Sequence, residues 1–295
     1  MKILILTGGN SSERKISLLS AKNVAEALKE NGHEIKIHDL KNGYGKIRQL
    51  AKDLDLLFPV LHGEEGEGGI LHEYIAKIGK PIIGTNNYIG LKKAWYKISF
   101  KKFCDKNRIL TSKWRIIENP GDIIKFGFPS VVKTSSGGSS REVFILKSKN
   151  DLIKQKRKIF KHKDLFVEKY IDGVEVTVAV LNNRALPVLE IVPPENGWFD
   201  YKNKYSGQTK EIPNAPSLRK ITKIKVQKIA LDIHKYFNLG SYSRTDFIID
   251  ERGKPVVLEI NTIPGLTSGS LVPNSVKAAG LTFNQMLEEL VKTAQ

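Results

Sequence analysis

The feature that most constrains this chain is a pair of strand-like segments joined by a short polar turn. Residues 243–250 read Ser-Arg-Thr-Asp-Phe-Ile-Ile-Asp, and residues 255–261 read Pro-Val-Val-Leu-Glu-Ile-Asn. The intervening Glu-Arg-Gly-Lys combines glycine with charged residues, a composition typical of turns. We therefore expect an antiparallel hairpin, in the register where Asp250 pairs with Pro255.

In that register four functional side chains lie together. Asp246 would lie opposite Glu259, and Arg244 opposite Asn261, all on one face because side chains alternate with a period of two. Two carboxylates, an amide oxygen and a guanidinium form a hard-oxygen cation site beside an anion binder. A magnesium-bridged triphosphate needs this combination. A cross-strand salt bridge is the alternative, but it explains neither the amide nor two facing acids.

The first part of the chain has the pattern of a parallel α/β unit. Short apolar runs at residues 3–6, 35–37 and 56–61 are bounded by Gly, Asn and His, and apolar positions at helical spacing lie between them. The helical positions are Leu18, Ala21, Val24, Ala25 and Leu28. Glu13 and His62 follow two of the expected strands. Since ligands collect at the carboxyl ends of parallel strands, both point toward a site.

The remaining segments predict two further α+β units. The expected helices span 88–104, the region after Asp151 and 217–237, and the expected strands span 113–117, 130–133, 143–146, 165–169 and 174–180. A loop rich in Gly and Ser, residues 134–141, follows Lys133 and could wrap backbone N–H groups around phosphate. A flexible hairpin is the alternative, and composition alone favours it. Neither a Walker loop nor a GxGxxG motif occurs.

Length and composition point to a multidomain globular protein. At 295 residues with 40% hydrophobic and 27% charged residues, we expect three domains at 1–87, 88–171 and 172–295. The single cysteine, Cys104, allows no disulfide within the chain. The first apolar run is too short for a signal peptide, and no run approaches a membrane span of roughly 20 residues. We expect a cytoplasmic protein.

The net charge of +17 suggests that the protein could bind nucleic acid or an acidic membrane. The lysines are spread over the whole chain without interleaved aromatic residues, so we expect neither partner. GxSxG and HExxH motifs are also absent, which argues against a serine triad and zinc hydrolysis. Phosphoryl transfer by positioning and electrostatics fits better, because it needs only metal ligands, lysines and backbone donors.

A set of short motifs in a fixed order resembles the D-alanine:D-alanine ligases, which have the ATP-grasp fold. Each motif is weak alone, but the ordered set covers nearly the whole chain and is highly specific. The motifs are Gly8-Gly9-x-Ser11-x-Glu13, His62-Gly63, Gly138-Ser139-Ser140, residues 167–171, Asp200-Tyr201 with Lys204-Tyr205, Arg244-x-Asp246-Phe247 and residues 259–273. The implied fold is a parallel α/β domain followed by two α+β domains that grip ATP between them.

The resemblance also implies roles for particular residues. Asp246, Glu259 and Asn261 would hold two Mg²⁺ or Mn²⁺ ions that bridge the ATP phosphates. The other nucleotide contacts would be Lys97, Lys133 and Lys204 on phosphate, Glu168 and Ile171 on adenine, Glu175 on the ribose, and Trp198 and Leu258 against the base. The substrate contacts would be Glu13 on the first ammonium with His62 nearby, Ser139 and Tyr205 linked to Glu13 in a closing lid, Arg244 and the Gly265 N–H in an oxyanion hole, and Ser270 and Leu271 on the second carboxylate.

The implied reaction joins two D-alanine molecules at the expense of ATP, through a D-alanyl phosphate, in the synthesis of a peptidoglycan precursor. We also expect a homodimer. Three positions depart from the family pattern: Tyr96 stands in place of Asp, Gly68 in place of an acid, and Arg141-Glu142 in place of Val-Gly. A ligase for D-lactate or D-serine is the close alternative, although Lys204-Tyr205 favours the dipeptide. A non-catalytic ATP-binding relative is the other.

The hairpin register gives a first testable prediction. Glu259→Gln should lose magnesium-dependent turnover while the protein stays folded, because a neutral amide does not balance a divalent ion as a carboxylate does. Turnover is measured across a magnesium titration, with circular dichroism on the same preparation. Turnover near that of the parent would contradict the metal-ligand assignment.

Overall fold

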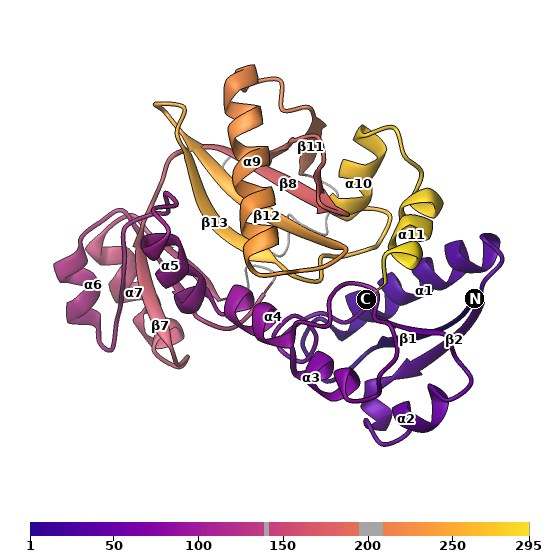
Figure 1. The fold of residues 1–295 in the computed structure, drawn as a ribbon. Helices are drawn as coiled ribbons and strands as arrows, with labels where there is room; N and C mark the ends of the chain where they lie inside the picture. Colours follow the sequence, from indigo (N-terminus) through magenta and orange to yellow (C-terminus); the bar gives the residue numbers. More distant parts are fainter. Residues whose placement is uncertain (139–141, 195–208, 295) are drawn as a thin grey trace.

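The computed structural model describes residues 1–138, 142–194 and 209–294. Three sheets are formed by successive parts of the chain, within residues 2–59, 114–169 and 173–261 (Figure 1). The first is parallel, as the sequence predicts, and the second and third are antiparallel.

The N-terminal sheet has the order β2-β1-β3 and forms as βα units. Its elements are β1 (Lys2–Thr7), α1 (Arg14–Glu30), β2 (Glu34–Asp39), the short helices η1 (Leu40–Asn42) and α2 (Ile47–Leu50), β3 (Leu56–Pro59) and α3 (Ile70–Ala76). Ala21, Val24 and Leu28 are buried under the sheet, as their spacing predicts. The prediction was wrong for Leu18, which is 36% exposed while Ser17 is buried. The buried face of α1 is therefore rotated toward its serines.

The long helix predicted over residues 88–104 is broken at Tyr96. It forms two helices, α4 (Tyr88–Trp95) and α5 (Lys97–Lys106), because Tyr96 adopts an extended ψ of 111°. The N–H of Lys97 donates to Ser135 O at 2.8 Å, and that of Ile98 to Ser135 Oγ at 3.3 Å. The Gly/Ser loop thus takes the hydrogen bonds that a continuous helix would have made.

The second sheet has the order β4-β7-β5-β6. Its elements are β4 (Trp114–Ile116), α6 (Pro120–Phe126), β5 (Ser130–Thr134), β6 (Val143–Leu146), α7 (Lys149–Ile159) and β7 (Leu165–Lys169). The four strands match the predicted ones to within about a residue at each end. Ser148 caps α7 in a capping box with Asp151, which explains why the helix begins before Asp151.

The third sheet has the order β11-β10-β8-β12-β13, with β9 paired to β8. Its elements are β8 (Gly173–Leu181), β9 (Arg184–Ala185), β10 (Leu189–Val192), β11 (Lys210–Pro213), α9 (Lys220–Tyr236), β12 (Tyr242–Asp250) and β13 (Pro255–Asn261). Val176, Val178 and Val180 pack with α9 in one core. Buried residues of α4 and α5 join the same core, so these helices pack on the third sheet although they precede the second in sequence.

The hairpin of β12 and β13 contains a bulge that the sequence did not predict. Ile249, not Asp250, pairs with Pro255, and the register shifts between Asp246 and Phe247 because Leu258 is an extra residue in β13. The shift restores the expected pairs Asp246 with Glu259 and Arg244 with Asn261. Both functional pairs are confirmed, although the turn register that suggested them was wrong.

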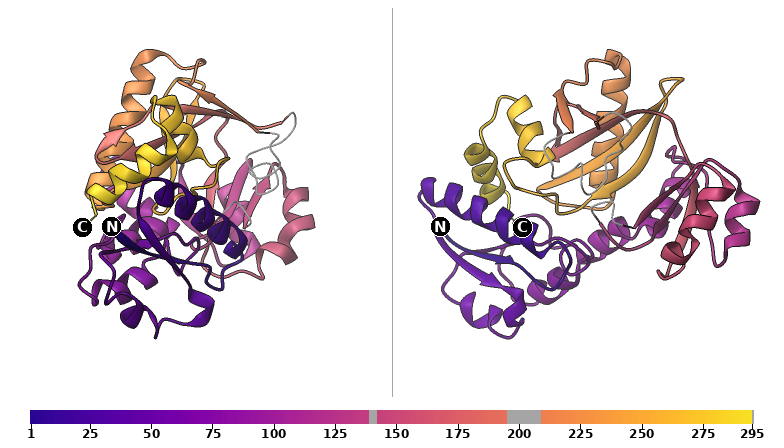
Figure 2. Two further views of the ribbon diagram at one scale, coloured as in Figure 1. Left: turned by 90° about the vertical axis from the view of Figure 1, so that its right-hand side faces the viewer. Right: turned by 180° about the vertical axis from the view of Figure 1, so that it is seen from behind.

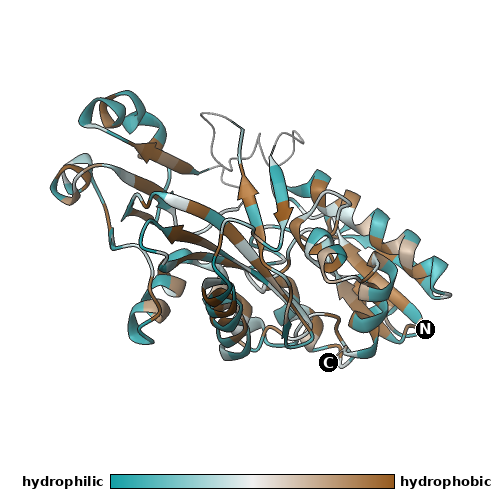
Figure 3. Cartoon of the chain, turned by 90° about the horizontal axis from the view of Figure 1, so that it is seen from above, coloured by the Kyte–Doolittle hydropathy of each residue, from teal (hydrophilic) through white to brown (hydrophobic). Residues whose placement is uncertain are grey.

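Of the last two helices, α10 (Leu271–Ala278) packs on β8 and β11 of the third sheet, and α11 (Phe283–Lys292) returns to the N-terminal unit. Helix α11 lies along α1 (Figures 1 and 2), and its Leu287, Leu290 and Val291 share one core with Ile3 and Ile5 of β1. Figure 3 shows hydrophobic residues concentrated along the strands, with helices that alternate in polarity. Among the described residues, no helix has the length and apolarity needed to cross a membrane.

This shared core generates a stability prediction. Leu290 is 0% exposed, so Leu290→Ala should lower the free energy of unfolding by about 2–5 kcal/mol through lost contacts and a cavity. Urea unfolding followed by circular dichroism measures the change. Lys292→Ala on the same helix, where the lysine side chain is 71% exposed, should shift stability by less than about 0.5 kcal/mol. Equal effects of the two substitutions would contradict the packing of α11.

Candidate active site

Two adjoining pockets lie between the three sheets. The larger, with a cavity volume of about 450 Å³, lies between the second and third sheets, and the smaller, about 90 Å³, lies where the N-terminal unit meets the third sheet. Both are lined by Lys97, Gly137, Gly138 and Glu259. The pockets are therefore neighbours that share one wall.

The larger pocket collects most of the residues expected to bind a nucleotide. Lys97, Lys133, Glu168, Ile171, Glu175 and Leu258 all line it. The carboxylate of Glu168, 2% exposed, accepts from Lys133 Nζ at 2.6 Å. Burial alone would raise the pKa of Glu168, but Lys101 and Lys133 hold it well below its usual range. Glu168 is thus a fixed anion beneath the pocket, with its side chain committed to lysines.

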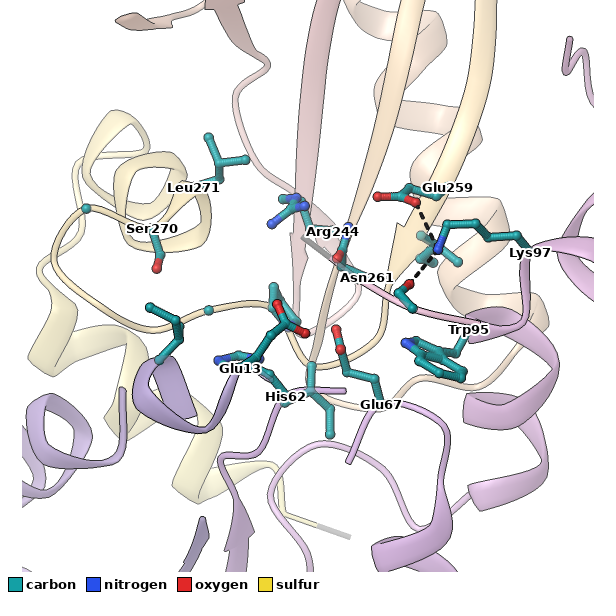
Figure 4. Close-up of a pocket in the computed structure, with 18 of the residues that line it drawn as sticks. Glu13, His62, Glu67, Trp95, Lys97, Arg244, Glu259, Asn261, Ser270 and Leu271 are labelled. Carbon is teal, nitrogen blue, oxygen red and sulfur yellow. Dashed lines mark hydrogen bonds and ion pairs between the residues drawn. The ribbon is translucent and has the colours of Figure 1, made fainter. Parts of the chain in front are cut away.

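The smaller pocket brings together Glu13, His62, Arg244, Gly265, Ser270 and Leu271, all predicted from separate motifs. Figure 4 shows the carboxyl groups of Glu13 and Glu67 pointing toward the same space near Arg244. Glu13 precedes α1 at its N-cap position, yet its side chain does not cap the helix. Its carboxylate is therefore directed into the pocket. Burial lowers the pKa of His62, while Glu13 opposes that shift.

Two glycines allow close approaches in this pocket. A Cβ added to Gly138 would lie 2.9 Å from Glu13 Oε2, so the Gly/Ser loop closely approaches Glu13. A Cβ at Gly265 would lie 2.8 Å from Ser270 Oγ, which accepts from Thr267 N at 3.1 Å. Side chains at either position would push these groups apart.

The hairpin face forms a closed network around Asp246. Arg244 donates to both of its oxygens at 2.9 Å, Asn261 Nδ2 donates at 3.1 Å, and Thr177 Oγ1 donates at 2.6 Å. Asp246 raises the pKa of Arg244 against the effect of burial. Arg244 and Asp246 both belong to β12, so this ion pair runs along one strand and is not the cross-strand salt bridge weighed as the alternative. Opposite Asp246, Glu259 lies 3.4 Å from Lys97 Nζ.

The donor set is compatible with a divalent metal, although it is small. Among the described residues, no group of three His, Cys, Asp or Glu could hold a metal ion. Asp246 and Glu259 lie opposite each other in the hairpin, and Asn261, two residues further along β13, donates its amide nitrogen to Asp246. Oxygen ligands of this kind suit magnesium when substrate phosphates and water complete the coordination.

Comparison with known proteins decides the family. The family model described as D-ala D-ala ligase C-terminus matches residues 99–292. The D-alanine–D-alanine ligase of Maridesulfovibrio salexigens is 36% identical over 304 residues, covering 100% of this chain and 99% of its own length. This chain belongs to the D-alanine–D-alanine ligase family.

Solved structures of family members have the same fold. The D-alanine–D-alanine ligase from Bacillus anthracis complexed with ATP is 31% identical, with a TM-score of 0.85 over 99% of this chain and 97% of its own. VanG D-Ala:D-Ser ligase from Enterococcus faecalis is 28% identical, with a TM-score of 0.83 over 99% and 98% of the two chains. The ligase chain has the ATP-grasp fold, as the motif order implied.

Two of the three departures from the family pattern, Gly68 and Tyr96, fit their local surroundings. A Cβ on Gly68 would lie 2.5 Å from Glu64 O, so this backbone leaves no room for the acid that the pattern expects. The hydroxyl of Tyr96 donates to Glu64 of the same loop. Arg141 lies outside the described residues, as do the predicted site residues Ser139, Trp198, Lys204 and Tyr205.

The sequence analysis gave no role to several ionisable residues at or beside the ligase pockets, among them Glu67, Glu211 and Lys101. Glu67 lines the smaller pocket, as does Glu211, whose Oε2 accepts from Asn274 Nδ2 at 2.5 Å. Lys101 lies beneath the larger pocket, 2.5 Å from Glu168. Glu67 follows His62-Gly63 within five residues, a local signal that could have identified it. Glu211 and Lys101 carry no such signal, because only packing brings them to the pockets.

Glu67 is the most perturbed of these acids. It is 6% exposed and accepts from Gly63 N at 2.8 Å. Burial raises the pKa of Glu67 to about 8, and the neighbouring charge of Glu13 adds to the shift. A carboxyl group with a raised pKa favours folding while protonated, and this contribution is lost as the pH rises from the unfolded value of 4.5 through about 8.

Glu67→Gln should therefore become more stable relative to the parent as the pH rises. We expect the difference in unfolding free energy to grow by at least about 1 kcal/mol between pH 5 and pH 9. Urea unfolding at three pH values measures it. Glu73→Gln, at a side chain that is 57% exposed, serves as the control and should show no such trend. A flat difference for Glu67→Gln would refute the raised pKa.

Proposed function

We propose that this ligase joins two D-alanine molecules into D-alanyl-D-alanine with cleavage of ATP to ADP and phosphate. The observation that carries the proposal is the shared wall of the two pockets, where Lys97, Gly138 and Glu259 line both. A nucleotide in the larger pocket would direct its terminal phosphate toward a substrate carboxylate in the smaller one. The relatives named D-alanine–D-alanine ligase support the same substrates.

In the first step, a carboxylate oxygen of the first D-alanine attacks the γ-phosphorus of ATP, and the bond from phosphorus to the β–γ bridging oxygen breaks to release ADP. Glu13 would hold the ammonium of this D-alanine, with His62 beside it. Lys97 and Lys133 would neutralise charge on the transferring phosphate. We assign Lys204 the same role, although it lies outside the described residues.

In the second step, the amine of the second D-alanine, after losing a proton, attacks the carbonyl carbon of the acyl phosphate. The tetrahedral intermediate then expels phosphate with the electrons of the carbon–oxygen bond. Arg244 and the N–H of Gly265 would stabilise its oxyanion, a contribution of about 10² to 10³ in rate for each donor. Ser270 and Leu271 at the start of α10 would hold the acceptor carboxylate.

The remaining assignments complete the proposal. Glu168 and Ile171 would contact adenine, Glu175 the ribose, and Leu258 and Trp198 the base, while Ser139 and Tyr205 would close over Glu13 and exclude water from the acyl phosphate. Asp246, Glu259 and Asn261 would hold two Mg²⁺ or Mn²⁺ ions. Bound metal would neutralise phosphate charge. The pairing of Arg244 with Asp246 would preset the guanidinium at the edge of that site.

D-serine as acceptor is the second candidate, because VanG D-Ala:D-Ser ligase has the same fold and 28% identity. A D-lactate ligase and a non-catalytic ATP-binding relative are less favoured, the latter because it would not need two facing carboxylates. We also propose a cytoplasmic homodimer that supplies a peptidoglycan precursor, with the three domains bounded at 87/88 and 171/172.

The test is ADP release with magnesium and ATP in the presence of single amino acids. We expect ADP release with D-alanine and none with L-alanine. With D-serine or D-lactate offered as the acceptor, we expect less ADP release than with D-alanine as the acceptor. Mass spectrometry of the products identifies the dipeptide. Equal ADP release with both alanine enantiomers, or none with either, would contradict a D-amino-acid ligase, and a dominant D-alanyl-D-serine product would favour the second candidate.

A further inference from the structure

A fully buried lysine lies beneath the nucleotide pocket. Lys101 of α5 is 1% exposed, and its ammonium lies 2.5 Å from Glu168 Oε2, 2.5 Å from Thr111 Oγ1 and 3.0 Å from Ser112 Oγ. Lys101 does not line either pocket, whereas Glu168 and Ser112 both line the larger one. Its effect on a ligand must therefore pass through these neighbours.

The carboxylate of Glu168 is divided between two lysines. Oε1 lies 2.6 Å from Lys133 Nζ, while Oε2 accepts from Lys101 and, at 2.5 Å, from Ser112 Oγ. Lys133 thus shares its counterion with a second cation. Removal of Lys101 would concentrate the attraction of Glu168 on Lys133, because the interaction of close charges in a buried site is strong. Lys133 would then be held back from an anion in the pocket.

Stability alone does not account for this cluster. Replacing a buried ion pair by apolar residues is often neutral or stabilising, since desolvation offsets the attraction between the charges. The cluster also has a definite orientation, because Thr111 Oγ1 accepts from Lys101 and donates to Val257 O at 2.9 Å, in the strand that carries Glu259. The position of Lys101 is therefore set from the third sheet.

We propose that Lys101 is a positioning residue for phosphate recognition. By sharing the carboxylate of Glu168, Lys101 limits the attraction of Glu168 for Lys133 and so leaves Lys133 able to bind the nucleotide phosphates. The assignment rests on the proposed nucleotide site. Lys97, one turn earlier on α5, lines both pockets. Two lysines four residues apart on one helix therefore have separate partners: Lys97 faces the expected phosphate site, and Lys101 binds the buried carboxylate of Glu168. Helix α5 links the two ends of the site.

The test compares ATP with adenosine, which lacks the phosphates. Lys101→Met should weaken ATP binding about tenfold or more and change adenosine binding by less than about threefold, because only phosphate depends on Lys133. Isothermal titration calorimetry measures both affinities. Lys102→Met makes the same chemical change at the exposed neighbouring lysine and should alter neither. Thermal melting of each variant tests whether it is folded.

Equal weakening for ATP and adenosine would overturn the proposal, because a general loss of structure affects both ligands alike. Unchanged ATP affinity in a folded Lys101→Met protein would overturn it as well. If that variant does not fold, Thr111→Val keeps the charge and removes one oxygen that orients it. We then expect a smaller loss of affinity, about two- to fivefold, for ATP and none for adenosine. An unchanged ratio of the ATP affinity to the adenosine affinity would refute the assignment. A parent that binds neither ligand would instead overturn the nucleotide site itself.

Discussion

The bulge at Leu258 is the constraint on which the rest of the site depends. It inserts one residue between the turn of the β12–β13 hairpin and its functional end, so that Asp246 faces Glu259 rather than Leu258. Without the extra residue, the two carboxylates would project from opposite faces of the sheet. One backbone irregularity thus decides that Arg244, Asp246, Glu259 and Asn261 lie on one face of the hairpin.

The pockets beside this hairpin face are completed by parts of the chain that are far apart in sequence. Lys97 meets Glu259 and also donates to Gly137 O at 2.8 Å, which ties α5 to the Gly/Ser loop. The N-terminal unit contributes Glu13 and His62 from the carboxyl ends of its strands. Helix α11 fixes this unit against the third sheet through a common core. The pocket therefore depends on contacts between the first and last hundred residues.

In this site, two buried carboxylates are each bound by several donors at once rather than by a single partner. Glu168 divides its carboxylate between Lys101 and Lys133, and Asp246 accepts from Arg244, Asn261 and Thr177. Each buried acid is thereby kept in a fixed position without neutralising every cation near it. Such an arrangement leaves lysines to face a polyanionic ligand, which suits an enzyme family that transfers phosphate.

The sequence by itself determined the family and the positions of most strands, because hydrophobic periodicity and the ordered motifs are local properties of the chain. It did not predict β9, β10 or β11 of the third sheet. It identified the pairs Asp246 with Glu259 and Arg244 with Asn261, although it assigned the wrong residue opposite Pro255. Only the tertiary structure decided the bulge, the break at Tyr96 and the recruitment of Lys101 and Glu211 to the pockets. The break and the recruitment of these residues depend on partners distant along the chain, such as Ser135 for the break and Glu168 for Lys101. Local propensity carries no information about such partners, so packing alone makes the choice.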